Sequence, residues 1–372
     1  MRRSITHFNL RNPRCLLMHA IGFLNHELLN YKDAREVFEN ALADYPGNNE
    51  LRFALANLLL DIGAKTTRMY GQKELKEATE LYLQVIYSEP KNLAAQVGLG
   101  KCQQISGCLM DAWHTLTKAI SRAVLPRYPN TDFTSQFAAV YEARASVNFQ
   151  MRRVDAAMCD LNTSLDLFPQ WPEALTNRGI LHHLHGNLNA AQQDFLRALD
   201  LDPQNIFSRL NYGILQLHTG RVQKALDCLS VSHIPCDLSY PELFLTRALC
   251  SVLLGKYEAA VLDLNSAENI LPTLPGAGDL KSWTLVHNVK AVIFSAQKSW
   301  LEAEREYSIH LKATPFDAIV FQARADIRLK MWQNGLLPDY SAALHDYHAA
   351  ILLAGGDLSD LQRGTLTRTS AP

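Results

Sequence analysis

The stretch PEALTNRGILHHLHGNLNAAQQDFLRALDLDP, residues Pro172–Pro203, contains two amphipathic helical patterns on either side of Gly186. Within each pattern apolar side chains recur every three or four residues, the spacing that places them on one face of an α-helix. Pro203 ends the second pattern, because proline lacks the amide hydrogen that a continuing helix needs. The stretch therefore predicts a hairpin of two helices.

The same pattern recurs along the chain with a period of 34 residues. Place 8 of the period is always Gly or Ala, place 20 is always Ala, and place 24 is always large and apolar. Two helices approach closely only where their side chains are small. We therefore expect each hairpin to close at places 8 and 20, beside the bulky residue at place 24. The nine copies begin at Cys15, Asn49, Leu93, Ala138, Pro172, Ile206, Pro241, Thr284 and Ala318.

This pattern resembles the tetratricopeptide repeat family, a family of 34-residue helical hairpins with small residues at the crossing and a closing proline. Proline stands at place 32 in six of the nine copies. The resemblance implies an all-α fold, a right-handed superhelix of stacked hairpins. The aromatic residue that the family often carries at place 4 is mostly absent here, where Arg52, Gln96 and Arg209 stand at that place.

Departures from the period predict the organisation of the chain. We expect a basic arm at residues 1–14, copies one to three at 15–126 with an insertion at 64–73, and a linker at 127–137. Copies four to seven then occupy 138–274, and a second linker occupies 275–283. Copies eight and nine occupy 284–357, and we expect a disordered polar tail at 358–372.

Charges at places 7 and 23 occur together. Five copies carry a cation at place 7 and an acid at place 23, and the other four carry neither. Buried charges are kept mainly when they are paired, so we predict five ion pairs within hairpins, with contacts to a ligand as the alternative. The pairs are Arg144/Asp160, Arg178/Asp194, Arg247/Asp263, Lys290/Glu306 and Arg324/Asp346.

Composition narrows the possible functions. The 36 Lys and Arg residues nearly balance the 37 Asp and Glu residues, which argues against a protein that coats nucleic acid. No apolar run is long enough for a membrane helix, so we expect no membrane insertion. The seven cysteines form no C-x-x-C pair and no secretory signal precedes them, so we expect core thiols in a reducing cytoplasm, with the cilium or nucleus as alternatives.

Histidines supply no complete metal site. His182, His183 and His185 form one group, and His345 and His348 form another, but neither group has a carboxylate or cysteine at helical spacing. The chain also lacks the nucleophile, zinc-protease and dinucleotide signatures. We therefore predict no metal, no cofactor and no enzymatic activity.

The family resemblance implies that places 2, 5, 6, 9 and 12 of the first helices line a concave groove. Side-chain amides there can hold a peptide backbone, while apolar neighbours supply affinity. The alternative is that these apolar residues pack between helices. In copies five to seven the candidate groove residues are Asn177, Asn211, Ile180, His183, Phe207, Leu210, Ile214, Leu245 and Leu249.

The sequence favours a non-catalytic scaffold or adaptor that binds partner peptides or subunits. Some members of the family clamp a chaperone's C-terminal carboxylate, but Thr176 and Ile180 stand where supporting polar groups are needed. One alternative is an accessory subunit of a larger enzyme or of a ciliary or transport complex. Another is an RNA-binding helical repeat protein, which would need a basic groove.

Overall fold

The computed structural model describes residues 13–28, 30–65, 71–122, 131–230, 241–270 and 280–354. The chain divides into two compact units, residues 1–215 and 216–372. Each unit is described by itself. The basic arm up to residue 12 and the tail from residue 358 lie outside the described residues, as does Cys236.

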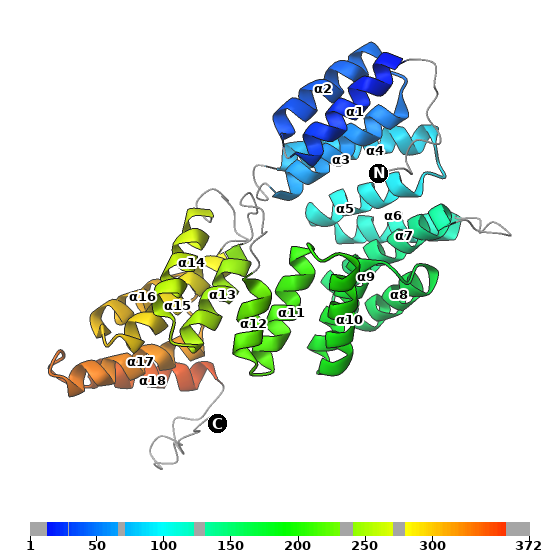
Figure 1. Cartoon of the computed structure of the whole chain (residues 1–372). Coiled ribbons are helices and arrows are strands. Elements are labelled where there is room, and N and C mark those ends of the chain that lie inside the picture. Colours follow the sequence, from blue (N-terminus) through cyan, green and yellow to red (C-terminus); the bar gives the residue numbers. More distant parts are fainter. Residues whose placement is uncertain are drawn as a thin grey trace. The chain divides into compact units, whose positions relative to one another are not determined.

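The first unit is built from consecutive helical hairpins (Figure 1). Its helices are α1 (Pro13–Glu27), α2 (Tyr31–Asp44), α3 (Asn49–Lys65), α4 (Gln72–Ser88), α5 (Leu93–Ile105), α6 (Leu109–Arg122), α7 (Thr131–Gln150), α8 (Val154–Leu167), α9 (Pro172–Leu184), α10 (Leu188–Leu201) and α11 (Ile206–His218), the last of which runs across the division.

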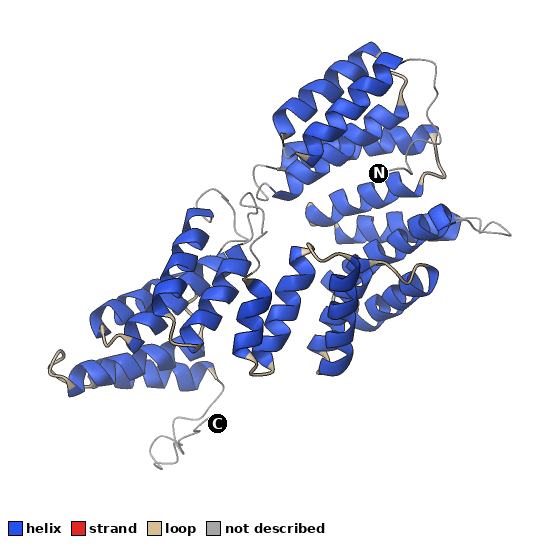
Figure 2. Cartoon of the chain, in the orientation of Figure 1, coloured by secondary structure: helices blue, strands red, loops and turns tan. Residues whose placement is uncertain are grey.

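The second unit continues the same construction. Its helices are α12 (Val222–Leu229), α13 (Pro241–Leu253), α14 (Tyr257–Ile270), α15 (Leu280–Ala296), α16 (Trp300–Ala313), α17 (Ala318–Gln333) and α18 (Ser341–Leu353). Figure 2 shows helices and loops only, and the described residues contain no strand. The predicted all-α repeat fold is confirmed.

Two kinds of contact hold each unit together. The two helices of a hairpin pack on each other, as α1 on α2 and α17 on α18. The second helix of a hairpin also packs on the first helix of the next, as α2 on α3 and α16 on α17. Copies that are joined in this way share their cores, which is how stacked repeats obtain stability that one hairpin lacks.

The hairpins close at the places that the sequence predicts. A Cβ atom on Gly179, at place 8, would lie 2.7 Å from the ring of Phe195 at place 24. Gly22 meets Phe38 in the same way, at 2.6 Å. The alanine at place 20 is at most 2% exposed in every copy. The small residues are therefore needed because the place-24 side chain fills the space beside them.

In copies three to eight the turn between the two helices of the hairpin has a left-handed residue at place 15. Gly107 and Gly186 have φ of 85° and 75° there. Copies four and eight carry Arg152 and Lys298 at this place, each with φ of 61°. The repeat thus imposes the turn conformation even where the residue is not glycine, in spite of the steric cost of that conformation.

Place 4 has a polar role in three copies. Arg52, Gln96 and Arg209 each donate a hydrogen bond to the carbonyl oxygen of the place-32 proline of the preceding copy. In the Gln96 bond the Nε2 atom lies 2.8 Å from the oxygen of Pro90. The donor satisfies a carbonyl beyond the end of the preceding helix, which explains why a polar side chain replaces the expected aromatic one.

Both linker predictions are partly wrong. Helix α7 begins at Thr131 and α15 begins at Leu280, so residues 131–137 and 280–283 are helical. In α7 the reason is aromatic packing one and two turns before the period starts. Phe137 is buried, and its ring lies 5.8 Å from the ring of Phe133 and 5.2 Å from that of Tyr141. Likewise α3 extends to Lys65 and α4 begins at Gln72, inside the insertion expected at 64–73.

The close crossing at Gly179 can be tested by substitution. Gly179→Val should lower the free energy of unfolding by about 1–3 kcal/mol, because a buried aromatic ring would have to move. Gly47→Val is the control, since a Cβ atom at Gly47 meets nothing within 4 Å. Urea denaturation followed by circular dichroism measures both. Equal midpoints for the two variants would contradict the close crossing.

Candidate functional site

The two asparagines of the predicted groove already have hydrogen-bond partners. Asn177 Nδ2 in α9 donates to Glu142 Oε1 at 2.8 Å. Asn211 Nδ2 in α11 donates to the carbonyl oxygen of Phe207, one turn earlier in the same helix, also at 2.8 Å. Both side chains are half-buried. Neither amide group therefore projects with both its donor and its acceptor open to a ligand.

Two of the predicted groove residues are buried. Leu210 is 7% exposed and Leu245 is 0% exposed, so the prediction that these side chains line an open surface is wrong. They pack between helices, the alternative that the sequence left open. The other apolar candidates, together with His183, remain accessible to different degrees. Phe207 is exposed, while Ile180, His183, Ile214 and Leu249 are half-buried.

A pocket of about 570 Å³ lies in the first unit, on the first helices of copies two to four. Its walls are formed by α3, α5 and α7. The lining residues stand at the groove places of the period and at positions next to them. The predicted places therefore do line a hollow, but in earlier copies than we expected. The lining residues are Asn57, Leu60, Asp61, Ala64, Ala94, Val97, Gly98, Lys101, Gln104, Ile105, Glu142, Ala143, Ser146 and Gln150.

Glu142 is the most perturbed group of the pocket. Its side chain is buried, and this loss of hydration raises the pKa of the carboxyl group. The charge of Lys101 and the hydrogen bond from Asn177 act in the opposite direction but do not cancel the effect of burial. The wall of the pocket thus carries a carboxyl group held partly out of water.

Other polar side chains around the pocket are linked in pairs. Gln104 Nε2 donates to Ser146 Oγ at 2.8 Å, which joins α5 to α7. The hydroxyl of Tyr82 donates to Asn57 Oδ1 at 2.6 Å. These groups leave lone pairs and amide hydrogens for a ligand backbone, while Val97 and Leu60 add apolar area.

One sequence signal could have located this pocket. Place 5 is occupied by an acid only in copy four, where Glu142 stands; copies three, six and seven have Val97, Leu210 and Leu245. When one copy carries a charge at a place that is uncharged in the others, that charge either pairs with another side chain or lies in a polar hollow.

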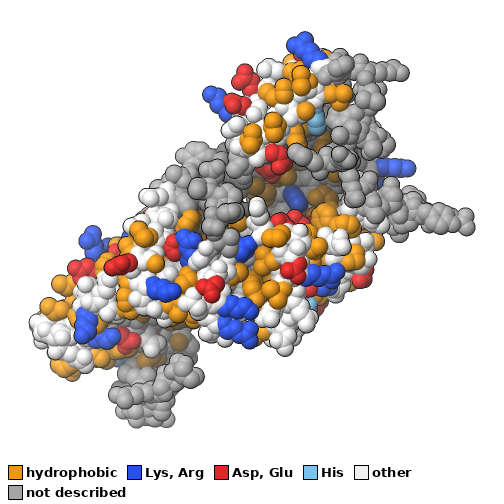
Figure 3. All heavy atoms as spheres, viewed as in Figure 1, with side chains coloured by type: hydrophobic (Ala, Val, Ile, Leu, Met, Phe, Trp, Pro, Cys, Tyr) orange, Lys and Arg blue, Asp and Glu red, His pale blue; other side chains and the backbone are white. Residues whose placement is uncertain are grey.

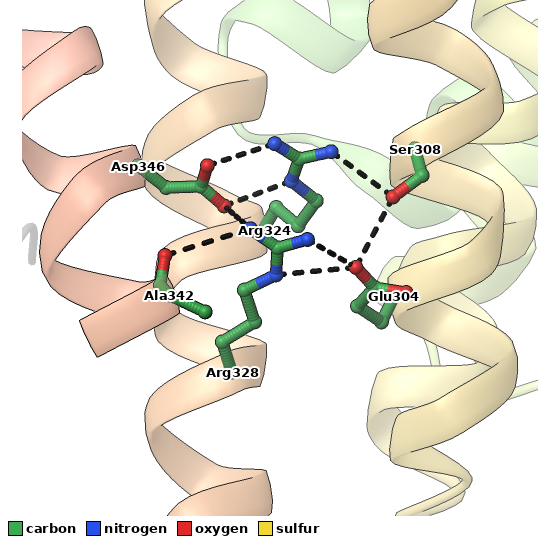
Figure 4. Close-up of polar contacts among 6 residues, drawn as sticks. All are labelled: Glu304, Ser308, Arg324, Arg328, Ala342 and Asp346. Carbon is green, nitrogen blue, oxygen red and sulfur yellow. Dashed lines mark hydrogen bonds and ion pairs between the residues drawn. The ribbon is translucent and has the colours of Figure 1, made fainter. Parts of the chain in front are cut away.

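Four of the five predicted ion pairs are present. Arg144, Arg178, Arg247 and Arg324 each donate two hydrogen bonds to the carboxylate of their place-23 aspartate. The Arg178–Asp194 distances, from Nε and Nη2, are 2.8 and 2.7 Å. Figure 4 shows the Arg324 example, in which Arg328 adds a bond to the same Asp346 and two to Glu304.

The fifth predicted pair, Lys290 with Glu306, is wrong. Lys290 Nζ lies 2.6 Å from Glu268 of α14, at the end of the preceding copy. Glu306 instead contacts His287 Nδ1 at 2.6 Å. Lysine offers a point charge rather than the planar fork that matches one carboxylate, so its partner is set by the nearest acid and not by the period.

Each of these arginines makes contacts in addition to its ion pair. In copies four, seven and nine the guanidinium lies over the aromatic ring at place 4, about 5.3–5.5 Å from its centre. In copies four, five and nine it also bonds an oxygen at place 25 of the preceding copy, as Arg324 Nη1 does with Ser308 at 3.0 Å. The charges therefore join copies and are structural.

Cysteines follow the sequence interpretation only in part. Cys102 and Cys250 are buried, and burial raises the pKa of Cys102 to about 12 and that of Cys250 to about 11. Cys108 and Cys159 are exposed, so the prediction of core thiols is wrong for them. Among the described residues, no helix has both the length and the apolar character needed to cross a bilayer.

Comparison with known proteins agrees with this geometry. Models of the tetratricopeptide repeat family match residues 27–67, which hold the second helix of copy one and the first helix of copy two, and residues 172–205, which are copy five. Tetratricopeptide repeats are therefore present in this chain. Human tetratricopeptide repeat protein 6 is 27% identical over 240 residues, 64% of this chain and 42% of that protein.

Further relatives and solved structures share the repeat. Human protein O-mannosyl-transferase TMTC2 is 26% identical over 55% of this chain and 27% of its own length. This tetratricopeptide repeat chain thus spans less than half the length of these curated relatives. The structure is similar in fold to the Cut9–Hcn1 complex of APC/C, with 15% identity, a TM-score of 0.52, and coverage of 95% of this chain and 76% of that chain.

The human IFIT1 dimer with m7Gppp-AAAA is similar to this tetratricopeptide repeat chain in fold as well. The identity is 16%, the TM-score is 0.54, and the coverage is 87% of this chain and 68% of that chain.

Removing one partner of a repeat ion pair should destabilise the chain. Arg178→Ala leaves Asp194, 8% exposed, without its cation. We expect a loss of roughly 2–3 kcal/mol in unfolding free energy, less than for a fully buried pair because Arg178 still meets water. Arg178→Ala/Asp194→Ala should lose less than the single variant. Lys290→Ala, at a more exposed pair, is the matched control. Thermal unfolding that shows purely additive losses would contradict the pairing.

Glu142 should make stability depend on pH. Its pKa is raised in the folded chain, so the folded state binds more protons than the unfolded state once the pH exceeds the ordinary glutamate value of 4.5. Stability should therefore fall as the pH rises through the raised pKa, and Glu142→Gln should remove that part of the fall. Urea midpoints between about pH 5 and 8 measure it, with the exposed Glu80→Gln as control. Parallel pH profiles for wild type and Glu142→Gln would contradict the assignment.

Proposed function

We propose that the chain is a non-catalytic scaffold that holds an extended segment of a partner protein in the pocket formed by α3, α5 and α7. The tetratricopeptide repeats and the solved repeat neighbours support a protein-interaction scaffold in general. The observation that carries the specific proposal is the pocket itself. Its volume of about 570 Å³ falls within the ~300–1,000 Å³ of usual ligand sites.

The pocket wall suits a polypeptide backbone. Gln104 and Asn57 present amide groups, and Ser146 presents a hydroxyl, on three successive first helices. An extended peptide places a donor and an acceptor at every residue, so amides and hydroxyls at intervals along a groove can bond it regardless of its sequence. Val97 and Leu60 supply apolar area between them.

Charge favours a protein partner over nucleic acid. The one cation of the lining set is Lys101, whereas Asp61 and Glu142 are acids. Nucleic acid binding draws its affinity from several cations that neutralise phosphates. The structure of IFIT1 with m7Gppp-AAAA therefore supports the fold of this chain, and the pocket chemistry does not favour an RNA ligand.

The names of the TMTC relatives include a transferase activity, which belongs to those whole proteins. The match covers about a quarter of the length of each relative, and in this chain the matched part consists of helical repeats. We assign the chain an accessory role if it works beside an enzyme. A role in a ciliary or transport complex would use the same peptide-holding groove, and a soluble cytoplasmic setting remains our proposal for its location.

Peptide selection tests the proposed groove. A phage-displayed library of random peptides would be selected on the full chain, and the recovered peptides measured by fluorescence anisotropy. Lys101→Ala/Gln104→Ala should weaken binding about tenfold or more, since both side chains line the pocket. Circular dichroism checks that loss of the Gln104–Ser146 hydrogen bond leaves the helix content unchanged. Asn211→Ala, in the originally predicted site, is the control and should bind as wild type.

Two outcomes would overturn the proposal. One is selected peptides whose affinity falls with Asn211→Ala and not with Lys101→Ala/Gln104→Ala. The other is tighter binding of a capped RNA oligonucleotide than of any peptide, with a steep loss of affinity as salt is raised.

A further inference from the structure

The outer face of α1 is apolar, and its side chains are exposed in the described part of the chain. Leu17 is 60% exposed, Ile21 is 41%, Leu24 is 55% and Leu28 is 61%. Their spacing of four, three and four residues places them in one stripe along the helix. Figure 3 shows hydrophobic side chains on this end of the first unit, over the helix that Figure 1 labels α1. We call these four residues the α1 stripe.

The repeat itself provides a control for this stripe. Leu17 and Leu24 stand at places 3 and 10, and in copies two to nine the residues at these two places are at most 2% exposed. Place 3 holds Leu51, Ala95, Val140, Ala174, Ser208, Leu243, Val286 and Val320, and place 10 holds Leu58, Cys102, Val147, Leu181, Leu215, Cys250, Ile293 and Ile327. The same two places are therefore a buried joint in every other copy.

In other copies a second helix covers this joint. Helix α2 packs on α3, α4 on α5, α6 on α7 and α8 on α9, and in the second unit α14 packs on α15 and α16 on α17. At each of these joints the occupant is the second helix of the preceding copy's hairpin. Because the α1 stripe presents the same places, the structure specifies the kind of element that fits there.

The joint between α2 and α3 is the best match to the stripe. Helix α3 presents Leu51, Leu55 and Leu58 at places 3, 7 and 10. Helix α1 presents Leu, Ile and Leu at these places. On the α2 side, Leu42 and Tyr45 pack against the same hydrophobic core as the three leucines. A helix with the chemistry of α2 therefore fits the α1 stripe.

The residue at place 7 further limits which helices can bind the α1 stripe. In copies four, five and nine the place-7 arginine bonds a hydroxyl or amide at place 25 of the preceding second helix. Ile21 cannot form such a bond, so the partner needs no polar group at that point. In α2 the place-25 residue is Glu39, which accepts a hydrogen bond from Arg35 of the same helix, so a helix of the α2 class fits. A helix of the α8 class would lose the hydrogen bond that Asn162 at place 25 accepts from a place-7 arginine.

We propose that the α1 stripe is a docking surface for an amphipathic helix of another protein, a helix with the chemistry of α2 that continues the repeat stack from outside. This surface is separate from the pocket of α3, α5 and α7, so it stands or fails independently of the proposed peptide groove. It gives the chain a second interaction mode, with helix packing in place of backbone bonding.

A peptide copy of α2 is a suitable probe. Residues 31–45 would be synthesised with a lactam between Lys32 and Glu36, two exposed side chains one turn apart, which holds the helix without altering the packing face. The labelled peptide is titrated with the full chain and followed by fluorescence anisotropy. We expect saturable binding that Leu42→Glu in the peptide weakens at least tenfold.

Variants of the full chain locate the binding. Leu17→Glu/Leu24→Glu should weaken probe binding at least tenfold, because two carboxylates would face the apolar partner. The matched control is Leu262→Glu/Phe316→Glu, which changes two apolar residues elsewhere that are even more exposed than Leu17 and Leu24. Leu17→Ser/Leu24→Ser repeats the test without added charge, and circular dichroism checks that all variants keep the helix content of wild type.

Three results would overturn the proposal. The first is an absence of saturable probe binding to the wild-type chain. The second is equal loss of binding in the stripe and control variants. The third is sedimentation showing that the wild-type chain self-associates through the stripe, with Leu17→Glu/Leu24→Glu restoring the monomer, because a second copy would then be the occupant.

Discussion

The contact between a glycine or alanine at place 8 and the large side chain at place 24 is the constraint on which the other features depend. It sets how closely the two helices of a hairpin approach, as the rings of Phe195 at Gly179 and Phe38 at Gly22 show. With that distance fixed, each second helix presents a constant surface to the next copy. The stacking, the inter-copy hydrogen bonds and the joint places all follow from that surface.

Polar contacts add to this packing, both within a hairpin and between neighbouring copies. An arginine at place 7 binds the aspartate of its own hairpin through two hydrogen bonds, and in three copies it also bonds an oxygen of the copy before. Place 4 either supports that guanidinium with an aromatic ring or, as in Gln96, donates to the preceding proline carbonyl. The variable places of the repeat are thus the ones that choose how neighbouring copies are joined.

The sequence was sufficient for the fold because the small and large places repeat nine times, and sterics alone decide what they do. It also predicted four of the ion pairs, since arginine and aspartate at matched places can meet in only one way. It failed for Lys290, whose flexible ammonium group takes the nearest acid, Glu268. It also failed to choose the copies that form the pocket. A hollow depends on how neighbouring helices sit together, and the side chains at Glu142 and Ser146 reveal it only when their surroundings are known.

The arginine bonds between copies give the joints of the chain unequal mechanical character. Where place 7 is apolar, as at Leu55 and Leu99, its side chain adds only dispersion contact to the joint, and the place-4 side chain of the same helix makes the hydrogen bond to the preceding copy. Where Arg144 or Arg178 reaches back to Thr117 or Asn162, a directional bond opposes the same displacement. The joints before the pocket-bearing helices α3 and α5 lack the guanidinium bond found before α7 and α9, so the spacing of these two helices is opposed by fewer directional bonds when a chain enters the groove.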